Sequence, residues 1–292
     1  MFRSGFVNII GKPNVGKSTL MNALVGEKLA IITPKAQTTR KRILGIVQSD
    51  ESQIIFSDTP GFIHQPQYKL HEWMKEQIQI ALQDADILIL MTMPGDDPDE
   101  DDPLLKKLTE IKIPLFIVIN KIDTISKETV ETIKNKWIKV FPGKEVFTIS
   151  ALKKKNIDIL QKKIIEHIPE HPAYFENDEL TDQTERFFAA EMIREKIFLH
   201  YQQEIPYSVE TAVEEYKDKG DIIVIKATIF VGRDAHKNII IGKGGSAIKQ
   251  VGIDARKDIE EFTGKNVFLE LFVKVKENWK NDDRMLKYFG YH

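Results

Sequence analysis

The chain has 292 residues, a formal net charge of −2 and no cysteine, and 42% of its residues are hydrophobic. This length predicts two domains, each large enough to bury its own hydrophobic core. The absence of cysteine excludes disulfides, thiolate zinc sites and thiol nucleophiles, and it fits a reducing compartment. No apolar run in the sequence approaches the ~18 residues of a membrane span, and the first apolar stretch is too short for a secretory signal, so we expect a cytoplasmic protein.

The small net charge hides an uneven distribution of charged residues along the chain. Residues 226–292 contain 13 lysines and arginines against 9 aspartates and glutamates, which gives +4. Residues 1–225 contain 29 basic and 35 acidic side chains, which gives −6. We therefore expect the C-terminal segment to bind a polyanion. We also expect the excess of acidic residues to lie mainly in the domain that precedes it.

Residues 1–168 alternate between short apolar runs and longer helical patterns, which predicts a doubly wound, mostly parallel α/β domain. The apolar runs are rich in Ile, Val and Phe, as expected of strands that are buried on both faces. In such a sheet a nucleotide binds at the carboxyl ends of the strands. The expected strands are 6–10, 54–56, 87–91, 115–119 and 146–149, and the expected helices are 17–25, 69–82, 104–111, 127–140 and 157–168.

The first strand and the first helix are joined by a loop of the pattern G-x-x-x-x-G-K-[ST]. Its glycines allow backbone N–H groups to turn toward a phosphate, and the following helix N-terminus favours negative charge. We expect Lys17 to bridge the β- and γ-phosphates and Ser18 to bind Mg²⁺. The flanking strand and helix argue against a glycine-rich turn without a ligand, but the loop does not choose between ATP and GTP. The loop consists of Gly11, Lys12, Pro13, Asn14, Val15, Gly16, Lys17 and Ser18.

Two later segments contain candidate ligands for the same metal ion. The sequence Gln-Thr-Thr-Arg after the first helix offers Thr38 and Thr39, and we favour Thr39 as a ligand that orders the loop when the γ-phosphate is present. After the second expected strand, Asp58 can hold a Mg²⁺-bound water, and the Gly61 N–H can contact the γ-phosphate. The alternative for the first segment is a polar loop that binds no ligand, and the alternative for the second is a simple turn. The second segment consists of Asp58, Thr59, Pro60 and Gly61.

The strand 115–119 is followed by the sequence Asn-Lys-Ile-Asp, which indicates which base the bound nucleotide carries. The carboxylate of Asp123 can accept hydrogen bonds from N1–H and the exocyclic amine of guanine, whereas adenine offers neither in that arrangement. A site that pairs specific polar groups discriminates by roughly 10⁴-fold, so this motif predicts GTP rather than ATP. After the next strand, the backbone of Ser150 and Ala151 is expected to contact the guanine carbonyl oxygen. The base motif consists of Asn120, Lys121, Ile122 and Asp123.

Two prolines stop the last helix of the first domain and open a polar linker, 169–183. The order of elements then changes, which predicts a separate α+β domain over 184–276 with a tail, 277–292, behind it. The expected elements are a long amphipathic helix at 184–203, strands at 209–216 and 222–231, an apolar strand at 239–241, a helix at 246–262 and a last strand at 267–275.

A G-x-x-G pattern precedes the helix 246–262, and in this setting it is typical of the RNA-clamping loop of KH domains. The glycines permit close approach of a phosphate, and Lys243 supplies a positive charge. An ordinary turn is the alternative for the loop, and a solvated charged face is the alternative for the basic residues on the helix. The expected RNA-binding residues are Ile241, Gly242, Lys243, Gly244, Gly245, Arg256 and Lys257.

In this order and spacing, the motifs of the first domain resemble those of the translation-factor-like GTPases. The sequences Asp-Thr-Pro-Gly and Gln-Thr-Thr-Arg, followed by a single C-terminal RNA-binding module, resemble the Era family, and the resemblance covers nearly the whole chain. It implies a P-loop GTPase domain over 1–168 followed by a smaller KH domain of the type II order.

The position after Asp-Thr-Pro-Gly is Phe62, where the best-known small GTPases carry a glutamine that orients the attacking water. Because Phe62 cannot hydrogen-bond to water, catalysis is expected to rest on the metal ion and the groups around the γ-phosphate, with His64 as an alternative base. The resemblance also implies, as a further hypothesis, a potassium ion beside Asn14. The expected catalytic residues are Lys17, Thr39 and Gly61.

The sequence therefore predicts a GTP-hydrolysing switch joined to an RNA-binding domain, with Mg²⁺ as the cofactor of GTP and GDP. By resemblance, the partners are the 3′ end of small-subunit ribosomal RNA and the small ribosomal subunit. A monomeric state and peripheral contact with the inner face of the cell membrane are further hypotheses. Two alternatives belong to other classes: an RNA-binding structural protein with a vestigial nucleotide site, and a GTPase whose main partner is a membrane or a protein.

Overall fold

The computed structural model describes residues 1–63 and 65–291, and the chain divides into two compact units. The segments Ile31–Thr38 and Gln65–Trp73 belong to the second unit, although the chain on either side of each belongs mainly to the first. Within the described ranges, no helix combines the length and the apolar character needed to cross a membrane. The first unit consists of Met1–Ala30, Thr39–His64 and Met74–Asp182, and the second of Ile31–Thr38, Gln65–Trp73 and Gln183–His292.

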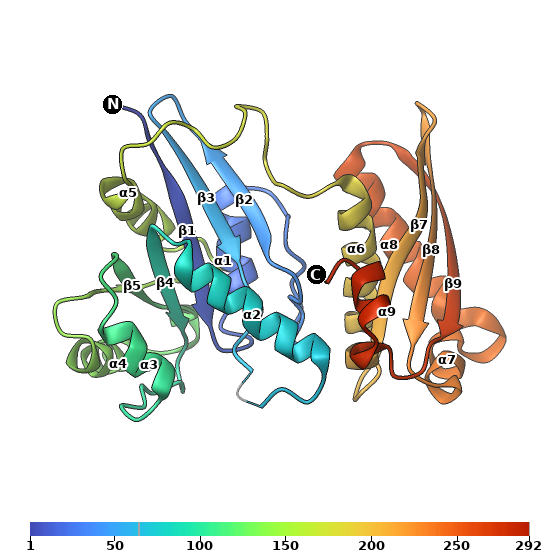
Figure 1. The fold of residues 1–292 in the computed structure, drawn as a ribbon, viewed down its shortest axis with the longest axis horizontal. Coiled ribbons are helices and arrows are strands. Elements are labelled where there is room, and N and C mark those ends of the chain that lie inside the picture. The colour runs from blue at the N-terminus through green and yellow to red at the C-terminus, as the bar shows by residue number, and fades with distance from the viewer. Residues whose placement is uncertain (64, 292) are drawn as a thin grey trace. The chain divides into compact units, whose positions relative to one another are not determined.

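A six-stranded sheet with the order β2-β3-β1-β4-β5-β6 forms the centre of the first unit. All neighbouring strands are parallel except β2 and β3, which are antiparallel. Strands β3, β4 and β5 are buried along their whole length, and Figure 1 shows α2 in front of the sheet and α1 behind it. The strands are β1 (Arg3–Gly11), β2 (Ile43–Gln48), β3 (Ser52–Asp58), β4 (Ile87–Thr92), β5 (Leu115–Ile119) and β6 (Glu145–Thr148).

The helices that alternate with these strands begin close to the residues that the sequence predicts. The Asp102 side chain accepts a hydrogen bond from the Leu104 N–H at 2.8 Å, and with Pro103 in the first turn it begins α3. Ser126 begins α4 in the same way, by accepting from the Thr129 N–H at 3.3 Å. The helices are α1 (Lys17–Val25), α2 (Lys69–Gln83), α3 (Pro103–Thr109), α4 (Lys127–Val140) and α5 (Ile157–His167).

Strand β2 is absent from the sequence prediction, because a glycine interrupts its apolar pattern. A Cβ at Gly45 would lie 2.6 Å from Cγ2 of Val25 and 3.3 Å from Cδ1 of Leu29. The glycine therefore lets β2 pack closely against the end of α1 and the loop behind it. Because glycine has a low strand propensity, the sequence of this segment does not indicate a strand clearly.

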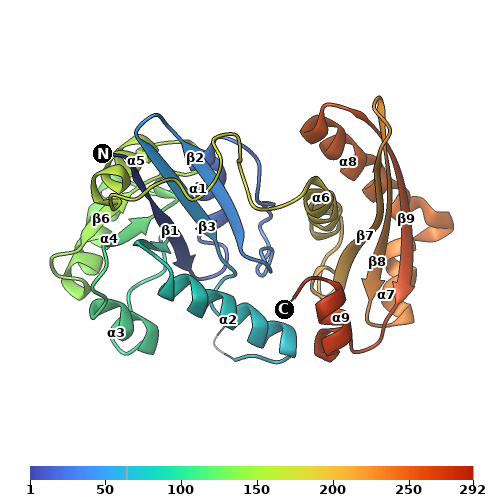
Figure 2. The same ribbon diagram turned by 45° about the horizontal axis from the view of Figure 1, so that its top comes forward.

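The second unit contains a three-stranded sheet in the order β7-β8-β9. Strands β7 and β8 are antiparallel, and β8 and β9 are parallel. Helices α6 and α8 lie along one face of this sheet in both views (Figure 1, Figure 2). The elements in chain order are α6 (Glu185–His200), β7 (Val209–Asp218), β8 (Ile222–Val231), α7 (Asp234–Ile241), α8 (Ser246–Thr263) and β9 (Asn266–Val275).

The apolar run 239–241 is the end of helix α7, so the strand predicted there is wrong. His236 and Ile240 lie one turn apart and are buried, whereas Ile239 is half exposed, which is the burial pattern of a helix. Three consecutive isoleucines resemble a buried strand, and this short run outweighed the helical spacing in the prediction. The helix ends at Gly242, which has a φ of 70°.

The C-terminal tail packs into the core of the second unit. Trp279 is 1% exposed, and its indole N–H donates to the carbonyl oxygen of Ser208 at 3.1 Å. The ring of Phe289 lies 5.5 Å from that of Trp279 and 5.1 Å from that of Phe230 on β8. Aromatic contacts of this kind are what hold the short helix α9 (Asp283–Tyr288) in place.

Candidate functional site

The phosphate loop connects β1 to α1 at the carboxyl end of the central strand. Gly11 and Gly16 have φ values of 155° and 101°. A Cβ at Gly11 would lie 2.3 Å from the carbonyl oxygen of Met91, and one at Gly16 would lie 2.4 Å from Nδ2 of Asn120. Both positions therefore exclude a side chain, and the loop can turn its backbone N–H groups toward a phosphate.

Lys17, the first residue of α1, has its ammonium group at this loop. It is 6% exposed, and Nζ donates to the carbonyl oxygens of Gly11 at 3.1 Å and Lys12 at 3.0 Å. Burial lowers the pKa of Lys17 to about 8, although the negative charge of Asp58 opposes the shift. The structure thus holds a buried cation where the sequence analysis expects the β- and γ-phosphates.

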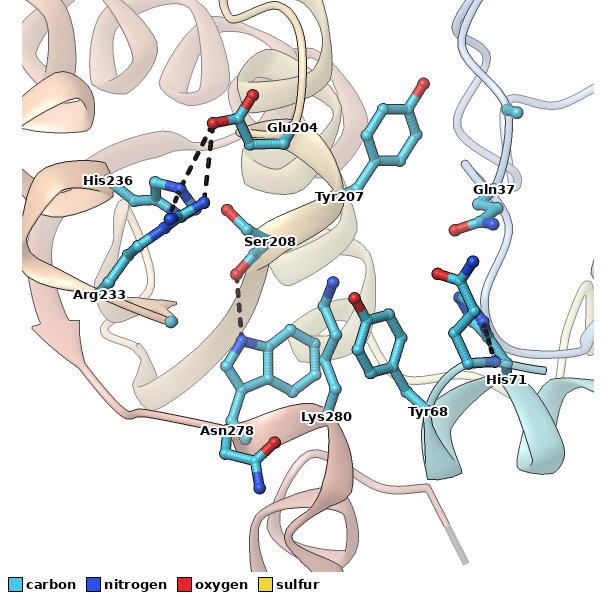
Figure 3. Close-up of a pocket in the computed structure, with 14 residues that line it drawn as sticks. Gln37, Tyr68, His71, Glu204, Tyr207, Ser208, Arg233, His236, Asn278 and Lys280 are labelled. Atoms are coloured by element: carbon cyan, nitrogen blue, oxygen red, sulfur yellow. Dashed lines mark hydrogen bonds and ion pairs between the residues drawn. The ribbon is translucent and has the colours of Figure 1, made fainter.

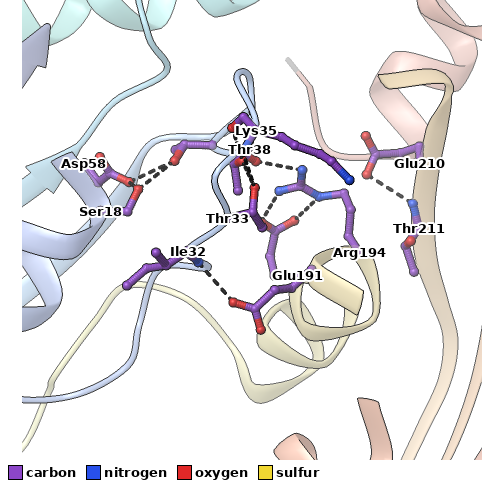
Figure 4. Close-up of polar contacts among 12 residues, drawn as sticks. Ser18, Ile32, Thr33, Lys35, Thr38, Asp58, Glu191, Arg194, Glu210 and Thr211 are labelled. Atoms are coloured by element: carbon purple, nitrogen blue, oxygen red, sulfur yellow. Dashed lines mark hydrogen bonds and ion pairs between the residues drawn. The ribbon is translucent and has the colours of Figure 1, made fainter. Parts of the chain in front are cut away.

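Three oxygen-bearing side chains from separate segments converge beside the loop. Ser18 Oγ lies 2.6 Å from Oδ2 of Asp58 and 2.9 Å from Oγ1 of Thr39, and Thr39 Oγ1 lies 3.0 Å from the same carboxylate oxygen (Figure 4). Burial raises the pKa of Asp58, whose Oδ1 has no hydrogen-bond partner among the described residues. Hydroxyls and a carboxylate oxygen suit a hard divalent cation, so the set fits Mg²⁺. Thr38 stands apart, because its hydroxyl pairs with that of Thr33 at 2.6 Å.

The base motif also braces the phosphate loop. Asn120 Nδ2 donates to the carbonyl oxygen of Val15 at 2.8 Å, and its Oδ1 accepts from the N–H of Ala151 at 2.9 Å. Lys121 Nζ donates to the carbonyl oxygen of Asn14 at 2.6 Å. The Ala151 N–H is therefore engaged by a side chain of the protein, and its expected contact with the guanine carbonyl oxygen stays a prediction.

Asp123 lies exposed in the turn after β5, beside Ser150. A hydrogen bond from Ser150 lowers the pKa of Asp123, and the positive charges of Lys153 and Lys121 lower it further. The side chain is thus held as a carboxylate, which accepts hydrogen bonds and donates none. The N1–H and amine edge of guanine suits such an acceptor.

The residues after β3 approach the phosphate loop through their backbone. A Cβ at Gly61 would lie 2.9 Å from the backbone nitrogen of Pro13, and the Phe62 N–H donates to the Gly11 carbonyl oxygen at 3.3 Å. The Phe62 ring packs against the hydrophobic core of the first unit. Its ring has no polar atom that could orient water, and the alternative base, His64, lies outside the described residues.

In the second unit, the G-x-x-G loop joins α7 to α8. Gly242, Gly244 and Gly245 have φ values of 70°, 60° and 79°. A Cβ at Gly242 would lie 2.6 Å from Cβ of Ala247, whereas Gly244 and Gly245 have no atom within 4 Å of that position. The first glycine thus allows the loop to pack against α8, and the other two leave open backbone beside the exposed Lys243.

A hollow of about 290 Å³ lies between α8 and β9, and both apolar and cationic side chains line it. Arg256 is one of the predicted RNA-binding residues, whereas Lys249 is absent from the prediction, although a spacing of seven residues places the two on one face of the helix. Lys257 is exposed and does not line the hollow. The lining residues are Ile248, Lys249, Gly252, Ile253, Arg256, Leu269 and Leu271.

A larger hollow, of about 480 Å³, lies elsewhere in the second unit and includes no predicted site residue (Figure 3). Lys280 Nζ lies 4.6 Å from the centre of the Tyr68 ring at its wall. Nε of Arg233 donates to Nε2 of His236 at 2.7 Å, which assigns the ring proton of this histidine to Nδ1. Nδ1 is buried and has no hydrogen-bond partner in the described part of the chain.

Comparisons with known proteins agree with this division of motifs. Residues 6–121 match a family model described as 50S ribosome-binding GTPase, and residues 204–280 match a KH domain model. The chain is 44% identical over 293 residues to the GTPase Era of Alkaliphilus metalliredigens, with 99% of each chain covered. It is 45% identical over 295 residues to the GTPase Era of Syntrophus aciditrophicus, covering 100% of this chain and 96% of that one.

Two solved structures share the fold over the full length, each with a TM-score of 0.95 and 38% sequence identity. One is an Aquifex aeolicus Era variant bound to GDP and AlF4⁻, with 99% of both chains covered. The other is Era in complex with MgGDPNP and nucleotides 1506–1542 of 16S ribosomal RNA, with 100% of this chain and 99% of that chain covered.

Proposed function

This chain belongs to the Era family of GTPases, and we propose that it is a Mg²⁺-dependent switch that binds the 3′ end of small-subunit ribosomal RNA during assembly of the small subunit. The observation that carries the proposal is the convergence of Ser18, Thr39 and Asp58 beside a phosphate loop. The relative bound to MgGDPNP and a 16S fragment supports it. In this proposal 1–168 is the GTPase domain, 169–183 the linker, 184–276 the KH domain and 277–292 the tail.

In the proposed hydrolysis, the loop backbone binds the β-phosphate and Lys17 spans the β- and γ-phosphates. Ser18 and Thr39 would hold the metal through their hydroxyl groups, and Asp58 would hold a water on the ion. When bound, Mg²⁺ neutralises charge on the phosphate oxygens. The Gly61 N–H donates to the γ-phosphate, and catalysis rests on these fixed positive groups.

We assign RNA binding to the G-x-x-G loop and the hollow beside it. The open backbone at Gly244 and Gly245 supports a clamp on the phosphates, with the exposed Lys243 as a counter-charge. The apolar side chains in the hollow between α8 and β9 suit unstacked bases, and Lys249 and Arg256 line the same hollow.

The RNA clamp can be tested with a matched pair of double variants. Lys243→Asp with Gly244→Asp should abolish binding of an RNA of the 16S 3′-terminal sequence and leave basal GTP hydrolysis unchanged. The control is Lys219→Asp with Gly220→Asp, because this second Lys-Gly pair lies in an exposed turn, between β7 and β8, and Gly220 also has open space around it. Retained RNA binding in the first variant would contradict the clamp.

The nucleotide site can be tested independently of RNA. Lys17→Ala should reduce single-turnover GTP hydrolysis by several orders of magnitude, since it removes a cation from the transferred phosphate. Lys127→Ala is the control, because Lys127 is likewise the first residue of a helix but is exposed. A wild-type protein that binds no nucleotide would instead support the alternative of an RNA-binding protein with a vestigial site.

Four further parts of the proposal come from the sequence or from the family resemblance. They are a potassium ion beside Asn14, a monomeric state, a cytoplasmic location, and peripheral contact with the inner face of the membrane. Equal hydrolysis in K⁺ and Na⁺ buffers would contradict the first, and light scattering tests the second. Flotation with vesicles of anionic lipid tests membrane contact, and binding to vesicles but not to RNA would favour the alternative of a membrane-directed GTPase.

A further inference from the structure

Helix α6 carries three charged side chains that are almost completely buried. Glu191, Arg194 and Glu195 are three and four residues apart, so they lie on one side of the helix, and they are 7%, 1% and 3% exposed. Apolar side chains cover most of the remaining sides. A helix that is buried all round is normally apolar, so this polar stripe requires partners, and segment 31–38 supplies them.

Arg194 binds this segment through one corner of its guanidinium group. Nη1 donates to the backbone carbonyl oxygen of Thr38 at 2.7 Å, while Nε donates to Oε1 of Glu191 at 3.0 Å and Nη2 donates to Oε2 (Figure 4). Burial disfavours the charge, but the carboxylates of Glu191 and Glu210 outweigh it and raise the pKa of Arg194. Glu191 therefore fixes a permanently charged fork and leaves Nη1 directed at Thr38.

Two further contacts fasten the same segment to α6. The Ile32 N–H donates to Oε1 of Glu195 at 3.0 Å. Lys35 Nζ donates to two backbone carbonyl oxygens where α6 ends. Within the segment, the hydroxyl of Thr38 donates to the carbonyl oxygen of Lys35 at 2.8 Å. The backbone before Thr39 is thus anchored at several points.

The next residue in the chain is the proposed metal ligand. Thr39 Oγ1 lies 2.9 Å from Ser18 Oγ and 3.0 Å from Oδ2 of Asp58. One peptide bond therefore separates the carbonyl group held by Arg194 from the residue whose hydroxyl lies beside the Ser18 and Asp58 oxygens. A shift of that carbonyl rotates the peptide and moves Thr39, because the peptide unit is planar.

We propose that Arg194, held by Glu191, is a positioning residue for the GTPase: it fixes the peptide between Thr38 and Thr39 so that the Thr39 hydroxyl reaches the Mg²⁺ of bound GTP. The inference rests on the proposed function, which assigns Thr39 to the metal. It makes α6 of the RNA-binding unit a working part of the nucleotide switch.

The anchored peptide gives nucleotide and RNA binding a shared element. GTP with Mg²⁺ favours the loop conformation that Arg194 binds, whereas GDP lacks the γ-phosphate that holds Thr39 in place. Because linkage is reciprocal, an RNA that binds better to the GTP state must strengthen GTP binding by the same factor. Couplings of this kind are typically about five- to 150-fold.

The test uses variants that remove the anchor together with the carboxylate that is hydrogen-bonded to it. Arg194 alone cannot be deleted cleanly, because the Glu191 carboxylate would lose its partner, so the main variant is Arg194→Met with Glu191→Met. Arg194→Lys keeps the charge but loses the planar fork. The control is Arg186→Met, since Arg186 lies on the same helix and also donates to backbone carbonyl oxygens, here on β7.

Two quantities are measured with the full-length protein. The first is the Mg²⁺ concentration that half-saturates GDPNP binding, and the second is the ratio of RNA affinities in GDPNP and GDP for an oligonucleotide of 16S nucleotides 1506–1542. We expect the double variant to need about tenfold more Mg²⁺, the usual loss when a support of a metal ligand is removed. We also expect its RNA affinity ratio to fall close to one, with Arg194→Lys intermediate and Arg186→Met unchanged.

An unchanged Mg²⁺ requirement and RNA ratio in both Arg194 variants would overturn the inference. Equal losses in Arg186→Met would also overturn it, because they would reflect general destabilisation of α6. A wild-type protein that hydrolyses GTP and binds RNA equally in both nucleotide states would leave the proposed function intact and still refute the coupling. A wild-type protein with neither activity would instead refute the proposed function.

Discussion

The ammonium group of Lys17 is buried at the loop where a polyphosphate is expected. Burial lowers the pKa of Lys17 from 10.5 to about 8, so the unfolded chain binds this proton more tightly than the folded one. The group therefore destabilises the fold fully below pH 8, and this penalty disappears as the pH rises from about 8 to 10.5. A phosphate beside the ammonium group reverses the effect, because an opposite charge favours the protonated form.

We predict that nucleotide binding at pH 8 takes up a proton at Lys17. With a pKa of about 8, a substantial part of the lysine is neutral at that pH before the nucleotide binds. Calorimetry of GDP binding in buffers of different ionisation enthalpy measures the uptake, and EDTA removes any contribution from metal binding at Asp58. Lys17→Arg should take up less, since its guanidinium is always charged, and equal uptake in both proteins would assign the proton to another group.

Base selection should depend on the carboxylate of Asp123. Asp123→Asn should shift the preference from guanine to xanthine nucleotides, because the amide offers a donor where the carboxylate offers only acceptors. Two charge-assisted hydrogen bonds are lost, so GTP affinity should fall about 100-fold. Competition between GTP and XTP measures the shift. Asp158→Asn, at an acidic position in the first turn of α5, is the control, and unchanged GTP affinity in the first variant would refute the assignment.

Among the elements, the C-terminal tail is expected to act as part of the core of the second unit. Trp279→Ala removes a side chain that is 1% exposed together with its hydrogen bond to Ser208, and should destabilise that unit by about 3–5 kcal/mol. Tyr288→Ala on α9 removes a ring that is 54% exposed and should cost clearly less. Chemical denaturation of the full chain measures both, and equal losses would contradict a core role for the tail.

The elements that the sequence predicts well are those whose signal is local. Strand β5 and helices α1 and α4 begin and end at the predicted residues, since apolar runs and end signals lie within each segment. Strand β2 and helix α7 are absent from the prediction, because a glycine needed for packing and a run of isoleucines produce misleading local patterns. The sequence predicts no structure for the tail, because the packing of its aromatic residues depends on contacts with β8, which is distant in the chain.

The same distinction separates the predicted site residues from those that were missed. The phosphate loop and the base motif each consist of consecutive residues, so the spacing within each motif already indicates its geometry. Arg194 and Glu191 act on Thr38 across more than 150 positions of the chain, and no local pattern marks that contact. Lys249 could have been found, because it lies on the same helix face as Arg256.

At the scale of the whole molecule, the charge is not divided between the domains as the sequence analysis expected. Residues 1–183 contain 24 basic and 26 acidic side chains, and residues 184–225 contain 5 and 9. Most of the acidic excess therefore lies in residues 184–225, in the first part of the KH region. The charge of +4 in residues 226–292 neutralises it. Glu214 on β7 and Lys274 on β9, for example, form an ion pair at 3.1 Å. Net charge per domain thus says little about RNA binding here, and local cations must account for it.

The dependence of RNA binding on salt should therefore report which cations meet phosphate. With single strands, each neutralised phosphate contributes about −0.7 to the slope of log K against log salt concentration. Arg256→Gln should reduce that slope by about 0.7, because Arg256 lines the hollow between α8 and β9. Lys257→Gln should leave the slope unchanged, since the Lys257 side chain is exposed and does not line this hollow. Fluorescence anisotropy over a series of KCl concentrations measures both slopes, and equal reductions would mean that RNA senses the general charge of α8 rather than the groove.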